Sequence, residues 1–118
     1  MGWVAYTDHP QVLLAGIENS SFLVTAVDPR GALIGLARAM SDDATICYVQ
    51  DILVRPEAQG GGIGRALLQA VLERYSHLRQ IVLITDDEPG QRAFYQALGF
   101  TEGAEVEYGP VRVFVQFR

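Results

Sequence analysis

Four glycines within five positions constrain the middle of the chain more than any other feature. Gly60, Gly61, Gly62 and Gly64 lie between an apolar run typical of a strand and an amphipathic segment that predicts a helix. Glycine backbone packs closely against a ligand, and a helix that begins there has N–H groups without intrahelical partners. Because such a helix start attracts anions, the stretch from Val54 to Arg65 predicts a phosphate site.

The two common nucleotide-binding glycine motifs do not fit this stretch. The Rossmann fingerprint needs a third glycine three residues after its second, where the chain has Arg65 or Leu67. The P-loop needs a lysine, and the chain has none. The alternative is a surface turn that binds nothing, but a plain turn seldom needs this much glycine between a strand and a helix.

The first half of the chain predicts mainly strands. A short edge strand is expected at residues 3–6, followed by a helix with Asp8 as its N-cap and an end near Ser20. A β-hairpin is expected from residue 21 to residue 37, because Asp28-Pro29-Arg30-Gly31 is a strong turn signal between two β-rich runs. A third strand is expected from Ala44 to Val54.

The second half predicts a βαβ unit, a further helix and a closing hairpin. The helix after Gly62 and an apolar strand at residues 80–85 give a crossover with parallel strands. The next helix is expected to start at Asp86-Asp87-Glu88-Pro89 and to end before Gly99. Residues 100–106 and 111–117 are expected to form the hairpin. The predicted fold class is therefore α/β (α+β).

Composition limits the partners of this chain. Its 118 residues fit one domain, residues 1–118. The net charge of −5 argues against nucleic acid and favours a cationic substrate. No apolar run is long enough for a membrane span and no signal sequence is apparent, so we expect a cytoplasmic protein that does not bind membranes. Cys47 and the two histidines are too few for a zinc cluster, so no metal is expected.

Two motifs together resemble a known family. Gln59-x-x-Gly62-x-Gly64 after a strand resembles the pyrophosphate loop of the GNAT superfamily of acyl-CoA-dependent N-acyltransferases. Phe94-Tyr95 followed by Gly99-Phe100 resembles a second GNAT signature, and the order of elements resembles the small bacterial members. The resemblance implies a mixed central sheet with flanking helices and a V-shaped strand splay that holds the cofactor. The chain departs from it in two places. The region before Ser21 is short, and many members have asparagine where this chain has Gly90.

The resemblance implies acetyl-CoA as cosubstrate and assigns residues to it. A backbone N–H near Leu53 or Val54 would polarise the thioester carbonyl. The pantetheine arm would lie along the end of the strand as an extra strand, and the loop would hold the pyrophosphate. An exposed helix arginine is the alternative for Arg65. The implied cofactor-binding residues are Ile52, Leu53, Val54, Gln59, Gly60, Gly61, Gly62, Ile63, Gly64 and Arg65.

The implied reaction is direct attack of a neutral primary amine on acetyl-CoA in a ternary complex, which requires a base. Asp51 is the first candidate, because strict alternation places it on one face with Val49 and Leu53. The alternative is a structural pair with Arg38 on the neighbouring strand. Glu57 and Asp86 are weaker candidates for the base.

Tyr95 matches the family tyrosine that often protonates the leaving thiolate, with an aromatic core residue as its alternative. Cys47 is expected to serve packing rather than a covalent acyl-enzyme. The competing function is a non-catalytic acyl-CoA-binding sensor or interaction module.

The acceptor stays open between a small-molecule amine and a protein lysine or N-terminus. The exposed edges of the predicted closing hairpin are compatible with a homodimer.

Overall fold

The computed structural model describes residues 9–118 and divides the chain into a unit that ends at Thr85 and a second unit, Asp86–Arg118. The edge strand expected at residues 3–6 and the cap expected at Asp8 lie outside the described residues. Within residues 9–118, every helix is too short or too polar to span a membrane.

The first unit begins with a helix and a β-hairpin, as predicted. Helix α1 (Pro10–Glu18) has His9 at its N-cap and proline in its first turn. Strands β1 (Phe22–Val27) and β2 (Leu33–Ser41) are antiparallel. The Asp28 carboxylate closes their turn by accepting the N–H groups of Arg30 at 2.8 Å and Ala32 at 2.9 Å.

Strand β3 (Ile46–Val54) pairs antiparallel with β2 and carries one extra residue. Ala39 is opposite Val49, but the preceding residue Arg38 is opposite Asp51, so Gln50 has no β2 partner. Such a bulge reverses which face the following side chains occupy. The expectation that Asp51 shares a face with Val49 is therefore wrong.

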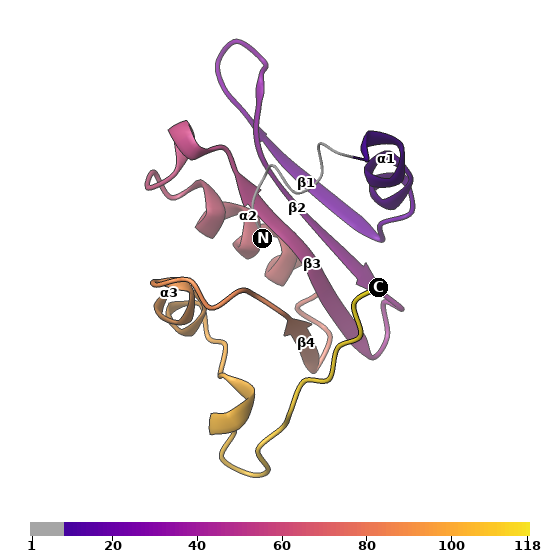
Figure 1. Cartoon of the computed structure of the whole chain (residues 1–118), viewed down its shortest axis with the longest axis vertical. Coiled ribbons are helices and arrows are strands. Elements are labelled where there is room, and N and C mark those ends of the chain that lie inside the picture. Colours follow the sequence, from indigo (N-terminus) through magenta and orange to yellow (C-terminus); the bar gives the residue numbers. More distant parts are fainter. Residues whose placement is uncertain (1–8) are drawn as a thin grey trace. The chain divides into compact units, whose positions relative to one another are not determined.

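Helix α2 (Ile63–Arg74) and strand β4 (Gln80–Leu83) complete the predicted βαβ crossover. Strand β4 pairs parallel with β3, which gives one mixed sheet in the order β1-β2-β3-β4. Helix α2 packs against β1, β2 and β3, and Figure 1 shows it beside the sheet. The mixed sheet and flanking helices confirm the predicted α/β class.

The core lies between α2 and one face of the sheet. Gly35 permits this packing, because an added Cβ would lie 3.0 Å from the Leu53 carbonyl oxygen, 3.1 Å from Leu67 and 3.3 Å from Ile63. Cys47 is buried here, and burial raises the pKa of its thiol, which agrees with a packing role. The buried members of the cluster are Ala37, Ala39, Cys47, Val49, Leu67, Val71, Tyr75 and Leu78.

The turn between β2 and β3 is tied to the end of α2. Asp43 adopts a left-handed conformation with φ of 61°. Its carboxylate accepts hydrogen bonds from Arg74 at 3.1 Å and contacts His77 Nε2 at 2.9 Å. The bond from Arg74 lowers the pKa of Asp43 below its ordinary value.

In the second unit, helix α3 (Gln91–Ala97) begins later than expected. Pro89 disfavours helical backbone at Glu88, and Gly90 with φ of 92° takes the N-cap position. Asp86 instead accepts a hydrogen bond from the Gln91 amide at 3.0 Å, which lowers the pKa of Asp86. Gly99, also with φ of 92°, ends the helix as predicted.

The predicted closing hairpin is wrong: residues 100–106 and 111–117 form no strand. A short 3₁₀ turn, η3 (Gly103–Glu105), interrupts the first segment. The N–H of Val111 bonds to the Gly103 carbonyl at 2.9 Å, but no ladder follows. Strand propensity depends on a partner strand, and Phe114 and Phe117 are each 88% exposed. The argument for a homodimer from hairpin edges is thereby removed.

Gly35→Ala is expected to destabilise the protein. The clash with the Leu53 carbonyl should cost about 1–3 kcal/mol, which exceeds the roughly 0.4–1 kcal/mol gained by stiffening the unfolded chain. Urea unfolding measures the change. Gly61→Ala is the matched control, because its Cβ would meet nothing closer than the Ala58 carbonyl at 3.9 Å. Equal stabilities of the two variants would contradict the packing argument.

Asp43→Asn is expected to lower the melting temperature slightly at neutral pH, because asparagine keeps the left-handed turn but loses the charge paired with Arg74. A carboxyl with a lowered folded pKa stabilises above its unfolded pKa, near ~3.9, and ceases to do so as the pH falls through the folded value. The difference from the unmodified protein should therefore shrink below about pH 4. Glu73→Gln is the control, and a difference that is constant with pH would contradict a charge effect.

Candidate active site

The end of β3 leaves one edge beyond the reach of β4. The parallel ladder runs from the pair Ile46–Gln80 to the pair Val49–Leu83, where β4 ends. Strand β3 continues to Val54, still paired with β2 at Gly35. The predicted residues Ile52, Leu53 and Val54 therefore extend past β4, as a strand splay requires.

The bulge assigns the end of β3 to two faces. Ile52 and Val54 pack with the α2 cluster, and Leu53, 6% exposed, shares the opposite face with Asp51. The three predicted residues thus contribute side chains to both faces, while their backbone lies along the edge that β4 does not cover. An extended ligand at this edge would be held by backbone groups rather than by these side chains.

The segment after β3 folds back on the strand. The N–H of Arg55 bonds to the Ile34 carbonyl at 2.8 Å, and a 3₁₀ turn, η2 (Pro56–Ala58), follows. The side-chain amide of Gln59 donates to the Val54 carbonyl at 3.0 Å. Gln59 therefore has a structural role, because it fixes the start of the glycine loop against the last residue of β3.

The glycine loop opens directly into α2. Gly60 and Gly62 both have φ of 86°, which favours glycine, and an added Cβ at either would meet nothing within 4 Å. Gly62 is the N-cap of α2, and no side chain caps this helix. The first intrahelical bond runs from the N–H of Ala66 to the Gly62 carbonyl at 3.0 Å. Glycines 60–62 are exposed, so an anion has access to the uncapped first turn.

Positive charge accompanies this helix start. Arg65 is exposed in the first turn and pairs with no acidic side chain among residues 9–118. The Nη1 of Arg55 lies 3.5 Å from Oε1 of Glu57, and both side chains are exposed. The Glu57 carboxylate, one of the weaker candidates for the base, is therefore paired with an arginine. The helix dipole, the free amides and Arg65 together favour a phosphate group at this loop.

Asp51 is buried and paired with Arg38. The Arg38 Nε donates to Asp51 Oδ2 at 2.5 Å, and the two residues are 8% and 3% exposed. The pair that the sequence left as an alternative is therefore present. Tyr48 lies on the same sheet face, and burial together with the Asp51 charge raises the pKa of its hydroxyl.

Tyr95 belongs to the second unit and lies in α3. Its ring contacts Phe94 edge-to-face with centroids 5.0 Å apart and Phe100 at 5.9 Å. Its backbone carbonyl accepts the N–H groups of Leu98 and Phe100, which terminates the helix. The half-buried ring therefore has the aromatic packing that the sequence left as its alternative.

Sequence reasoning missed the surroundings of Arg38. Its Nη1 lies 3.4 Å from Ser20 Oγ, and an added Cβ at Gly16 would lie 3.1 Å from the same nitrogen. A glycine inside a predicted helix was the signal for such a close approach. Gln50 carried no comparable signal for the bulge.

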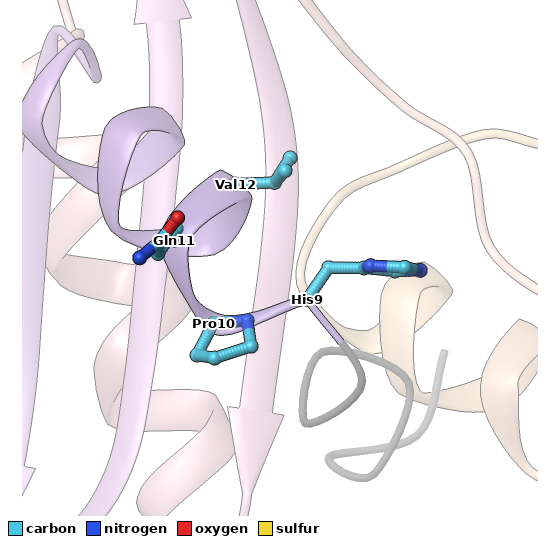
Figure 2. A pocket seen from close by; sticks show the side chains of 4 residues that line it. All are labelled: His9, Pro10, Gln11 and Val12. Atoms are coloured by element: carbon cyan, nitrogen blue, oxygen red, sulfur yellow. The ribbon is translucent and has the colours of Figure 1, made fainter.

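A shallow depression at the start of α1 contains none of the predicted site residues. Figure 2 shows the His9 side chain extending away from the helix there; the lining is His9, Pro10, Gln11 and Val12. For metals, the part of the chain from residue 9 onward contains no cluster of three or more His, Cys, Asp or Glu side chains suited to an ion.

Comparison with known proteins agrees with this geometry. A family model for the acetyltransferase (GNAT) domain matches residues 18–102. A GCN5-related N-acetyltransferase from Arabidopsis thaliana is 43% identical over 77 residues, 62% of this chain and 28% of the relative. A histone acetyltransferase from Glycine max is 37% identical over 115 residues, 86% of this chain and 49% of that protein. The chain spans half or less of the length of these curated relatives.

Solved structures share the fold. A GNAT-family acetyltransferase from Streptococcus pneumoniae superposes with a TM-score of 0.77 at 24% identity, covering 92% of this chain and 80% of that one. The family model covers most of the sequence, from the end of α1 past α3. The chain therefore belongs to the GNAT family of acetyltransferase domains.

Proposed function

We propose that the chain transfers an acetyl group from acetyl-CoA to a primary amine by direct attack in a ternary complex. The observation that carries the proposal is the exposed, uncapped start of α2, entered through Gly60 and Gly62 with positive φ. This geometry suits a pyrophosphate, because free amides and the helix dipole both favour negative charge. Membership of the GNAT family supplies the identity of the cofactor.

The proposed cofactor path runs from the edge of β3 to the glycine loop. The pantetheine arm would bond to backbone groups of Ile52, Leu53 and Val54, on the edge that β4 leaves uncovered. A backbone N–H near Leu53 or Val54 would stabilise the developing oxyanion. The pyrophosphate would lie against the amides from Gly60 to Arg65, where Gln59 already anchors the loop through the Val54 carbonyl.

The proposed proton transfers involve Asp51 and Tyr95. The acceptor amine must lose a proton to attack, and Asp51 lies two residues before Leu53. Its ion pair with Arg38 holds the carboxylate in a fixed position. We propose that Asp51 takes the proton either directly from the acceptor amine or through a water relay. Tyr95 would return a proton to the thiolate of CoA, by analogy with the family tyrosine.

The acceptor is proposed to be cationic in its resting form, because the chain has a net charge of −5. A small amine, a protein lysine and a protein N-terminus share this chemistry. The Glycine max relative is named a histone acetyltransferase, which places lysine peptides on the panel of acceptors to be tested.

A single experiment separates this proposal from a non-catalytic acyl-CoA sensor. Acetyl-CoA, CoA and ATP are titrated separately by calorimetry, and thiol release is then followed with arylalkylamines, polyamines and lysine peptides. Binding of the CoA ligands in preference to ATP, with thiol release that depends on an amine, would support the acetyltransferase. Binding without release would favour the sensor, and no binding would overturn the cofactor site.

Gly61→Val is expected to weaken acetyl-CoA binding by about tenfold or more, because a side chain in the loop prevents close approach of the pyrophosphate. The backbone φ of Gly61 is ordinary and its added Cβ meets nothing closer than the Ala58 carbonyl at 3.9 Å, so stability should change by less than about 0.5 kcal/mol. Calorimetry and urea unfolding measure the two effects. Ala32→Val, in the exposed β1–β2 turn, is the control, and unchanged affinity would contradict a phosphate cradle.

Tyr95→Phe is expected to lower kcat by about a hundredfold with little change in the dissociation constant of acetyl-CoA, because it removes only the proton donor. Steady-state thiol release and calorimetry measure these quantities. Tyr108→Phe removes a hydroxyl from a side chain that is 94% exposed and serves as the control. An unchanged kcat for Tyr95→Phe would contradict the proton-donor role and favour a packing role, of which the ring contacts with Phe94 and Phe100 are part.

A further inference from the structure

Arg38 joins three elements through one buried guanidinium. It projects from β2, and its Nε donates to Asp51 Oδ2 on β3 at 2.5 Å. Its Nη1 is 3.4 Å from the Oγ of Ser20, which lies just beyond the end of α1. The Ser20 hydroxyl in turn donates to the Gly16 carbonyl at 2.8 Å. A planar guanidinium with several donors suits such a junction, whereas a lysine ammonium does not.

Helix α1 approaches the guanidinium closely because of Gly16. An added Cβ at this position would lie 3.1 Å from Arg38 Nη1 and 3.6 Å from Cζ. The guanidinium cannot simply turn aside, because its Nε is held by the buried Asp51 carboxylate. The position of α1 is therefore coupled to the position of Asp51.

This junction lies on the sheet face opposite the α2 core. Asp51 lies on that face because it is paired with Arg38. The next cross-strand pair on the same face, Leu36 with Leu53, lies closer to the end of β3. The glycine loop is held by other contacts: the Gln59 bond to the Val54 carbonyl and the packing of α2 at Gly35. A disturbance at Arg38 should therefore reach α1 and Asp51 while sparing the pyrophosphate loop.

We propose that Arg38 is a positioning residue that holds α1 and the Asp51 carboxylate together as the acceptor side of the site. The inference rests on the acetyltransferase function proposed above. It names the junction at Arg38 as the part of the site that positions the acceptor amine. Arg38 acts through Asp51 and α1, and the cofactor loop does not depend on it.

Two variants test the junction in different ways. Arg38→Lys keeps the charge but loses the planar fork that reaches Asp51 and Ser20. Gly16→Ala keeps every charged group and displaces the guanidinium slightly through its Cβ. Arg74→Lys is the control, because Arg74 pairs with Asp43 at the exposed end of α2.

Kinetics provide the first measurement. Arg38→Lys should raise the KM for the amine about tenfold, with a smaller rise for Gly16→Ala, while the dissociation constant of acetyl-CoA changes less than about twofold. Arg74→Lys should change neither. Equal weakening of amine and acetyl-CoA in Arg38→Lys would indicate general loosening and would overturn the positioning role.

Hydrogen exchange provides a measurement that needs no turnover. Amides of α1 should exchange faster in both variants, while amides of α2 keep their protection. The result for Gly16→Ala is decisive, because alanine is the better helix former and would otherwise protect α1. Unchanged exchange in α1 would overturn the inference alone, whereas absence of amine-dependent thiol release in the unmodified protein would overturn the proposed function together with the acceptor role.

Discussion

The register of β3 against β2 determines what the rest of the first unit can do. Before the extra residue, Gln50, the odd-numbered side chains of β3 join the α2 core. After it, the odd-numbered residues Asp51 and Leu53 lie on the opposite face of the sheet. Without it, the carboxylate would point into the apolar cluster under α2, where an unpaired charge is prohibitively costly. With it, Asp51 meets Arg38 and the strand still ends beside the glycine loop. The bulge thus allows the second half of β3 to keep Ile52 and Val54 on the α2 core while Asp51 reaches the polar pair on the opposite face.

In the proposed site, the two sides would use different sources of affinity. The loop from Gln59 to Arg65 would bind through backbone amides and a helix dipole, and such binding needs mainly that side chains do not block the approach. The junction at Arg38 relies on side chains, a buried ion pair and a close approach of helix to guanidinium. Substitutions should therefore alter the second side more readily than the first.

Much of the first unit could be predicted because its signals are local. The turn at Asp28, the glycine loop and the helical period after Gly62 each report their own conformation, and the structure has a hairpin, a loop and α2 in those places. The pairing of Arg38 with Asp51 was open as one of two alternatives, since strand order placed them on neighbours. The cofactor residues were assigned through the glycine motif and the family signature. Their chemical roles stay proposals.

The errors concern features that depend on distant partners. A bulge at Gln50 follows from the fit of two strands, and nothing in the residue itself marks it. The β-rich run from Val111 to Phe117 has strand propensity, yet residues 106–118 form no ladder. Acidic residues before Pro89 resemble a helix start, but the left-handed Gly90 places the first turn later.

The burial of Cys47 also bears on how the chemistry can be observed. It is the one cysteine of the chain, it is 1% exposed, and burial raises the pKa of its thiol, so it presents almost no thiolate at neutral pH. Reagents that detect sulfur nucleophiles react with thiolate and need access to it. In a mixture with the folded protein they would therefore register free CoA against a nearly silent background, and a slow rise in signal from the protein alone would mark its unfolding.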